Sequence, residues 1–204
     1  MRIHLRRWSL GSGGCKLKIK QILEDDGSCE HLVGAPLPDI ALPTTDGMSV
    51  TLSRLTETTV IYCYPMTSQP KVLPPDGWDE IPGARGCTPQ NCSFRDNFLE
   101  LSKLNAVVFG MSTQDTDYQK EMAERLHLPY SVISDSNFEF CDILNIPTFI
   151  ADGKRLMKRV TIIIEDGIIE AVHYPIFQSE SDPSWVISYL SLKIKNATKA
   201  ANLA

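Results

Sequence analysis

The order in which β-rich runs and helical patterns follow one another most constrains the fold of this chain. Residues 60–64 (VIYCY) form a β-rich apolar run that ends at Pro65, which is typical of a buried strand. A strong hairpin signal, Glu165-Asp166-Gly167, separates two later apolar runs. The predicted strands are 60–64, 106–111, 130–133, 159–164 and 168–173, and the predicted helices are about 88–103, 115–126, 138–144 and 185–192.

This succession predicts an α/β fold with a central mixed sheet flanked by helices. Asp46-Gly47 adds a short hairpin within residues 40–55. Residues 66–86 are rich in Pro and Gly and show little periodicity, so we expect a long loop there. Loops of that length inside a compact domain tend to be functional or disordered. The pattern alone does not select one α/β arrangement over another.

The length of 204 residues fits one domain with short extensions. Prolines punctuate an extended entry at Gly34, so we expect a domain over residues 34–192 and a loose tail over 193–204. Residues 1–33 form a basic extension whose first acidic residue is Glu24. Residues 1–23, which contain no acidic residue, are either a disordered basic arm or an organellar transit segment. We therefore expect a cytoplasmic protein, with an organellar location as the alternative.

Composition excludes several classes of protein. The formal net charge of −5 argues against nucleic-acid binding, and no apolar run approaches the roughly 18 residues that span a membrane. Six cysteines are too few for a disulfide scaffold in a chain of this length. No CxxC pair occurs and the histidines are scattered, so we expect no metal site and no cofactor. The remaining question is which cysteine is reactive.

Cys87 has the most informative position, because it stands directly before the helix that Thr88-Pro89 opens. Unpaired N–H groups and the helix macrodipole favour a thiolate at such a position. Arg85 adds positive potential. The simpler alternative is a small buried hydrophobic residue, which is our interpretation of Cys63 inside the strand at 60–64.

Cys92 follows five residues later. In a regular helix, five residues place two Cα atoms about 7.5 Å apart along the axis and about 140° apart around it. That separation is too large for a disulfide, whose Cα atoms lie under about 7 Å apart. A bond between Cys87 and Cys92 therefore requires roughly residues 86–93 to unwind.

The segment Gly86-Cys-Thr-Pro-Gln-Asn-Cys-Ser-Phe-Arg-Asp96 resembles the GCTxExCxFRD motif of the peroxiredoxin Q and bacterioferritin comigratory protein group. Residues 34–47 resemble the entry segment of that family, and residues 107–113 resemble its VxGxSxD strand. Arg159-Val-Thr161 resembles the strand that carries its active-site arginine. The resemblance covers about residues 34–192 and implies a thioredoxin-like fold.

The resemblance implies a thiol peroxidase that reduces hydrogen peroxide and organic hydroperoxides. Cys87 would be the peroxidatic cysteine, Cys92 the resolving cysteine, and Arg159 would hold the thiolate and polarise the peroxide. A thioredoxin- or glutaredoxin-like donor would return the electrons, and the protein would be a monomer or homodimer. Without the resemblance, Arg159 is an ordinary strand-end charge.

Other functions and partners stay open. The same cysteine pair could serve a dithiol–disulfide oxidoreductase, a redox sensor or a redox-regulated chaperone. Cys141, another subunit or an external thiol could resolve in place of Cys92. Cys15 and Cys29 lie in the extension and are most simply free thiols.

The sequence departs from the family motif at two points. The family places a threonine three residues before the peroxidatic cysteine, where this chain has Ala84. If residues 68–83 are an insertion, Pro65 and Thr67 supply the family's proline and threonine. Pro82 is the weaker alternative, from a resemblance to the PGAFTPxC loop of another peroxiredoxin class. Gln90 replaces the family's glutamate, which leaves the local charge open.

Overall fold

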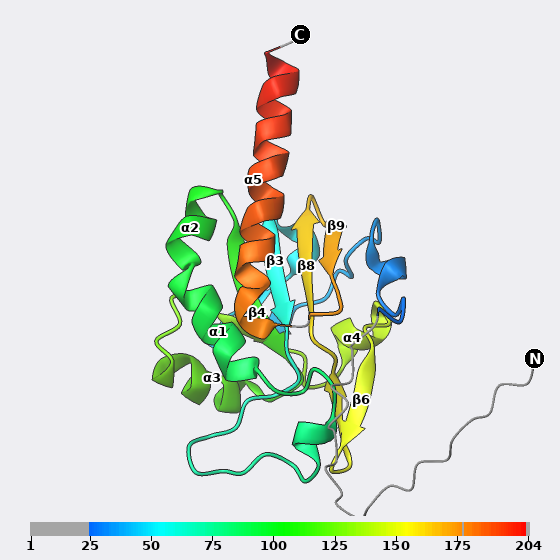
Figure 1. The fold of residues 1–204 in the computed structure, drawn as a ribbon, viewed down its shortest axis with the longest axis vertical. Coiled ribbons are helices and arrows are strands. Elements are labelled where there is room, and N and C mark those ends of the chain that lie inside the picture. The colour runs from blue at the N-terminus through cyan, green and yellow to red at the C-terminus, as the bar shows by residue number, and fades with distance from the viewer. Residues whose placement is uncertain (1–24, 177, 203–204) are drawn as a thin grey trace, which may run out of the picture.

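The computed structural model describes residues 25–176 and 178–202. Its centre is a five-stranded sheet in the order β5-β4-β3-β8-β9 (Figure 1). Strands β3, β4 and β5 run parallel, whereas β8 pairs antiparallel with both β3 and β9. The predicted mixed sheet is therefore confirmed. The strands are β3 (Thr59–Cys63), β4 (Val107–Ser112), β5 (Val132–Ser134), β8 (Val160–Glu165) and β9 (Ile168–His173).

Five α-helices accompany the sheet in the described residues: α1 (Cys87–Asp96), α2 (Phe98–Lys103), α3 (Thr116–Arg125), α4 (Glu139–Ile143) and α5 (Asp182–Ala201). The helix predicted over about 88–103 is interrupted at Asn97, which caps both α1 and α2. At the start of α3 the Asp115 side chain accepts a hydrogen bond from the Tyr118 amide at 2.8 Å.

Both faces of the sheet are covered, because successive side chains of a strand point to opposite sides. From β3, Val60 and Tyr62 contribute to a core beneath α1, α2, α3 and α5. Ile61 and Cys63 contribute to a second core on the other face. This core is covered by α4 and by residues 29–37. Side chains that belong to different cores therefore lie on opposite faces of the sheet.

Two hairpins agree with the sequence and one was missed. The turn at Asp46-Gly47 joins β1 (Leu42–Pro43) to β2 (Ser49–Val50), and Asp166-Gly167 joins β8 to β9. A further hairpin pairs β6 (Thr148–Ala151) with β7 (Lys154–Met157). Its turn, Asp152-Gly153, has positive φ at both residues and carries the Asp-Gly signal that could have revealed it.

The N-terminal boundary at residue 34 was wrong. Cys29, which precedes the 3₁₀ turn η1 (Glu30–Leu32), and Leu32, the last residue of that turn, are buried in the core opposite α1. Asp26 also pairs with Lys158 at 2.8 Å. The domain therefore includes at least residues 25–33. The expectation of a disordered arm or transit segment over the preceding residues lies outside the described part of the chain, and so does Cys15.

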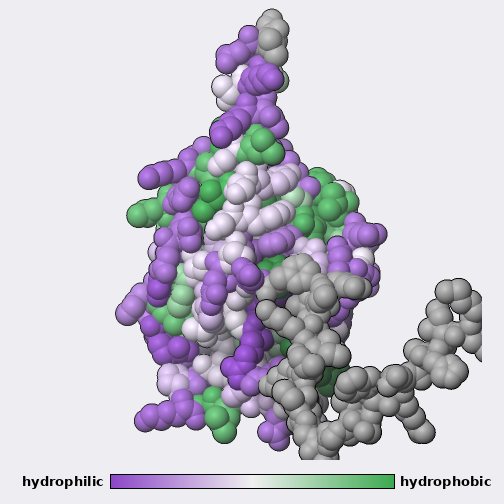
Figure 2. All heavy atoms as spheres, viewed as in Figure 1, coloured by the Kyte–Doolittle hydropathy of each residue, from purple (hydrophilic) through white to green (hydrophobic). Residues whose placement is uncertain are grey.

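The expectation of a loose tail was wrong for residues 193–201. They continue α5, whose C-terminal half stands clear of the body in Figure 1. Its projecting end is mainly hydrophilic in Figure 2, with hydrophobic surface gathering where the helix meets the body. Ala and Lys recur in this stretch and favour helix even without a buried face. Within the described residues, no helix combines the length and the apolar character needed to cross a membrane.

Candidate active site

Cys87 is the first residue of α1, one position earlier than the sequence indicated. It is 5% exposed, and its Sγ lies 3.5 Å from the Ala84 carbonyl oxygen. Gly86 precedes it with φ of 103°, a conformation that side-chain-bearing residues rarely adopt. A Cβ at Gly86 would also lie 2.2 Å from Ser179 Oγ. Glycine is therefore required to turn the chain into α1 and aim Cys87 inward.

Arg159, which immediately precedes β8, is 4% exposed and reaches across to α1. Its Nη2 lies 3.3 Å from Cys87 Sγ. Its Nη1 donates a hydrogen bond to Gln90 Oε1. The guanidinium therefore contacts the sulfur directly and places a positive charge beside it.

Thr67 and Cys87 line the same cavity of about 490 Å³, together with residues of the loop between them. The backbone N–H of Thr67 donates to Gln114 Oε1 at 2.8 Å, and its hydroxyl lies 3.3 Å from the same oxygen. Gln114 Nε2 donates back to the Thr67 carbonyl at 2.9 Å. Gln114, which no sequence motif indicated, therefore fixes Thr67 at the cavity.

The other residues considered from sequence lie elsewhere. Pro65 is buried, and it is not among the residues that line the Cys87 cavity. Pro82 borders a different cavity of about 320 Å³, which Arg159 also lines. The Arg85 side chain points to Asp79, with which it forms an exposed ion pair. The positive charge beside Cys87 is therefore that of Arg159, and the expected contribution of Arg85 is largely neutralised.

Cys92 lies five residues after Cys87 on α1 and is partly exposed. It packs, partly buried, at the edge of the core beneath α1. Cys87 and Cys92 are both free thiols within one continuous helix. The structure therefore holds the pair in the separated arrangement that the helix geometry requires.

The other described cysteines are poor nucleophiles. Burial raises the pKa of Cys29 and of Cys141 to about 12, and raises that of Cys63 well above its ordinary value. All three belong to the core on the face of the sheet opposite α1. The expectation that Cys63 is a buried hydrophobic residue agrees with this position. Cys141 lies across the sheet from Cys87, which argues against it as a resolving cysteine.

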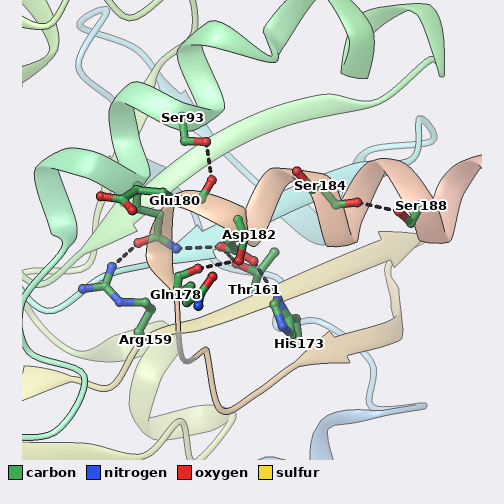
Figure 3. A network of polar contacts seen from close by, with 11 residues as sticks. Ser93, Arg159, Thr161, His173, Gln178, Glu180, Asp182, Ser184 and Ser188 are labelled. Carbon is green, nitrogen blue, oxygen red and sulfur yellow. Dashed lines mark hydrogen bonds and ion pairs between the residues drawn. The ribbon is translucent and has the colours of Figure 1, made fainter.

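No group of three or more His, Cys, Asp or Glu side chains is placed to hold a metal ion in residues 25–176 and 178–202. The chemistry that the described site offers is that of a sulfur beside a guanidinium. Sequence reasoning missed the side chains behind Arg159. Gln90 Nε2 donates to Asp182 at 2.7 Å, and Asp182 also contacts Thr161 and His173 (Figure 3). No local motif marks Asp182, because it lies 95 residues after Cys87.

The fold and this site define a thioredoxin-like α/β protein with a cysteine at a helix start beside a buried arginine. A family model described as Redoxin matches residues 32–186. The chain belongs to the Redoxin family. Within it the chain is related to the peroxiredoxins of the Q and bacterioferritin comigratory protein group, as the motif at residues 86–96 indicated.

Curated relatives agree with this placement. Peroxiredoxin bcp1 of Schizosaccharomyces pombe is 34% identical over 109 residues, which are 52% of this chain and 48% of the relative. The chloroplastic peroxiredoxin Q of Suaeda salsa is 28% identical over 77% of this chain and 66% of its own length. The putative peroxiredoxin bcp of Coxiella burnetii is 29% identical over 69% of this chain and 86% of its own length. The chain thus spans about half to two thirds of the first two of these relatives.

Solved structures support the fold. Peroxidoxin BcpB of Mycobacterium tuberculosis superposes with a TM-score of 0.63 at 24% identity, covering 78% of this chain and 96% of that protein. Peroxiredoxin Q of Xanthomonas campestris gives a TM-score of 0.64 at 20% identity, covering 79% and 98%. These superpositions show that the three chains share a fold.

Proposed function

We propose that this chain is a thiol peroxidase in which Cys87 is oxidised by peroxide and Cys92 resolves the product. The observation that carries the proposal is the contact of 3.3 Å between Arg159 Nη2 and Cys87 Sγ at the start of α1. A guanidinium and a helix N-terminus both favour a thiolate at this sulfur. The names of the relatives, all peroxiredoxins, agree with this chemistry.

In the first step the Cys87 thiolate attacks the terminal oxygen of the hydroperoxide. A sulfur–oxygen bond forms, the oxygen–oxygen bond breaks, and the leaving alkoxide takes a proton to become an alcohol, or water when the substrate is hydrogen peroxide. Cys87 becomes a sulfenic acid. Arg159 is the group that stabilises the charge which moves from sulfur to the leaving oxygen.

Thr67 is our candidate for the hydroxyl that the motif lacks at Ala84. We infer that residues 68–83 are an insertion in the family loop, since Thr67 lines the cavity of Cys87 although it lies 20 positions earlier in the sequence. In this arrangement the Thr67 hydroxyl, held near Gln114, contributes a hydrogen bond to the bound peroxide. Pro65, buried two residues after the end of β3, would shape the backbone that leads to Thr67.

In the second step the Cys92 thiol attacks the Cys87 sulfenic acid, and water leaves as the disulfide forms. This step requires the first turns of α1 to unwind, because the helix holds the two thiols apart. An external dithiol of the thioredoxin or glutaredoxin kind then reduces the disulfide by exchange.

A rapid-mixing experiment tests the proposal. Hydrogen peroxide or an organic hydroperoxide is mixed with the reduced protein, and sulfenic acid at Cys87 is followed by dimedone trapping and peptide mass spectrometry. We expect oxidation at least a hundredfold faster than that of free cysteine, and we expect no rapid oxidation in Cys87→Ser. A rate no faster than that of free cysteine rejects the peroxidase and favours a dithiol oxidoreductase or redox switch.

The resolving role is tested with Cys92→Ser. We expect this variant to accumulate the sulfenic acid and to stop turning over with a thioredoxin-type donor. A matched Cys141→Ser variant should turn over like the unsubstituted protein. Unchanged turnover in Cys92→Ser would transfer the resolving role to another subunit or to an external thiol.

The location of the protein is part of the proposal. We propose a cytoplasmic enzyme, with organellar import as the alternative, since one of the relatives is named chloroplastic. A fluorescent fusion of the whole chain, compared with one lacking residues 1–23, separates the two. The same preparations, run on a sizing column, distinguish a monomer from a homodimer.

A further inference from the structure

Arg159 is a buried cation whose hydrogen bonds, among the residues that the structure describes, reach no carboxylate directly. In residues 25–176 and 178–202, its guanidinium donates to Cys87 Sγ, to Gln90 Oε1 and otherwise only to the backbone carbonyl groups of Gly83, Ala84 and Arg85. A buried charge is costly unless an opposite charge or several hydrogen bonds compensate it. The thiolate of Cys87 provides such a charge only while the cysteine is reduced and ionised.

A second buried charge lies one side chain behind the first. Asp182, the first residue of α5, is completely buried. It accepts hydrogen bonds of 2.7 Å from Gln90 Nε2 on α1 and from Thr161 Oγ1 on β8. Its other oxygen lies 2.7 Å from His173 Nδ1 on β9 (Figure 3). All three contacts are with side chains outside α5. They therefore connect Asp182 to α1 and to the sheet, and they do not cap α5.

Gln90 joins the two charges. Its amide oxygen accepts from Arg159, and its amide nitrogen donates to Asp182. The cation and the anion therefore each fix one end of the amide. A glutamate at this position would also accept from Arg159, but it would bring two carboxylates within about 3 Å of each other, where one of them would have to take up a proton. The neutral amide of Gln90 is therefore compatible with the carboxylate of Asp182, whereas a glutamate at position 90 is not.

We propose that Asp182 is a positioning residue for Cys87, acting through Gln90 to hold Arg159 against the sulfur. Charges alternate along the path, from the Asp182 carboxylate to the Arg159 guanidinium to the Cys87 thiolate. Thr161 and His173 fix the carboxylate, and the His173 ring is itself held by stacking on Trp185 at 4.6 Å between ring centroids. This inference rests on the proposed function, for which the ionised Cys87 is the reactive species.

The arrangement explains the departure of this chain from the glutamate of the motif. The negative charge that the glutamate would supply beside the arginine is present here, but it comes from α5 and reaches the arginine through an amide. A carboxylate at position 90 and one at position 182 are alternatives, and the two together are unfavourable. Exchanging them should preserve the site.

This exchange gives the test. Asp182→Asn, Gln90→Glu and the double variant Gln90→Glu/Asp182→Asn are compared in the full-length chain. The first readout is the rate at which iodoacetamide alkylates Cys87 at neutral pH, measured on the peptide that contains it. The second is the ultraviolet absorbance of the thiolate. Neither readout needs peroxide, so a failure of the proposed peroxidase activity would not obscure the result.

We expect Asp182→Asn to slow alkylation of Cys87 about tenfold, the size that loss of one hydrogen bond to a charged group typically produces. The double variant should return to within about threefold of the unsubstituted rate. The peroxide reaction should follow the same order. A merely structural role of Asp182 would lower the melting temperature of the single variant without a matched recovery of the Cys87 thiolate in the double variant.

Two further variants keep the test decisive if Asp182→Asn folds poorly. Thr161→Val keeps the shape of the side chain and leaves the charge of Asp182 in place, but it removes one hydrogen-bond donor to that carboxylate. It should slow alkylation of Cys87 about two- to threefold. Asp142→Asn is the matched control, because Asp142 pairs with Arg155 away from the site and should leave the rate unchanged. Unchanged alkylation in both Asp182→Asn and Thr161→Val, or a double variant no faster than Asp182→Asn, overturns the proposal.

Discussion

Replacing Tyr62 with phenylalanine should accelerate disulfide formation by loosening α1. The Tyr62 hydroxyl donates a hydrogen bond of 2.7 Å to Asn91 Oδ1, and both residues are completely buried. Asn91 Nδ2 in turn donates a hydrogen bond of 2.9 Å to the Cys87 carbonyl oxygen. The Tyr62 ring stacks on Phe94 at 4.1 Å, and phenylalanine retains that contact. The substitution therefore removes one anchor between the sheet and the segment that must unwind.

The size of the effect follows from the side-chain oxygen of Asn91, which loses its hydrogen-bond donor in the folded helix. An unsatisfied buried acceptor costs about 1–3 kcal/mol, whereas water satisfies Asn91 once the turn unwinds. This cost applies to the folded turn and not to the unwound one. Since about 1.4 kcal/mol corresponds to a factor of ten, the population of unwound α1 should rise roughly 5- to 150-fold.

A peroxide pulse in a stopped-flow instrument separates the two steps that matter. The first phase, sulfenic acid formation at Cys87, should stay within about twofold, because Tyr62 does not line the Cys87 cavity. The second phase, disulfide formation, should become at least about fivefold faster. Amide hydrogen exchange should accelerate over residues 87–93 but not in the sheet. Tyr189→Phe removes a hydroxyl on α5 and should change neither phase.

One pattern of results would refute this reasoning. If exchange over residues 87–93 accelerates while the second phase keeps its rate, disulfide formation does not pass through unwinding of α1. The partner of Cys87 would then have to reach it without unfolding the helix, as a cysteine of another molecule could. A large loss in the first phase would instead show that the hydroxyl helps to shape the reactive end of α1.

Three further outcomes follow from the contacts described above. Arg159→Lys keeps the charge but loses the planar fork that reaches both Cys87 and Gln90, so oxidation by peroxide in stopped flow should slow about 10- to 100-fold; an unchanged rate would remove Arg159 from the mechanism. Because burial raises the pKa of Cys141 to about 12, mapping of iodoacetamide-labelled peptides at neutral pH should find Cys87 labelled well before Cys141, and labelling of Cys141 should rise with pH; equal labelling at neutral pH would contradict its assignment as inert. The hydrogen bond from Lys158 lowers the pKa of Asp26, so its contribution to stability is present above about pH 4 and is lost as the pH falls; the melting temperature of Lys158→Met should therefore decline less on acidification than that of the unsubstituted chain, and parallel declines would count against this pair.

The sequence predicted the sheet well because its signals are local. The apolar run at 60–64 and the Asp-Gly turn at 166–167 each depend on neighbours only a few residues away, and both elements are present. Other elements depend on distant contacts. Leu32 lies in a short segment with no periodicity, and its burial follows from packing against the sheet. The last turns of α5 were missed for the opposite reason, since they are exposed and have no apolar pattern.

The same division holds at the site. The motif from Gly86 to Asp96 indicated Cys87, because a helix start can be read from adjacent residues. It could not indicate that Arg85 would turn away to Asp79. From the sequence, Thr67 is a candidate for the site only if residues 68–83 are an insertion, and the sequence does not show how such an insertion folds. Sequence proximity is thus a poor guide to which charges and hydroxyl groups meet the sulfur.

Gln90 is the residue for which this matters most. Considered within the motif, it is the loss of a carboxylate beside the arginine. Considered within the fold, it lies between Arg159, which directly precedes β8, and Asp182, which begins α5 after the β8–β9 hairpin. Antiparallel pairing brings Thr161 on β8 opposite His173 on β9, and α5 then places Asp182 against both. The negative charge of the site is therefore specified by strand register and by the start of the last helix, so a substitution at position 90 can be interpreted only together with the residue at 182.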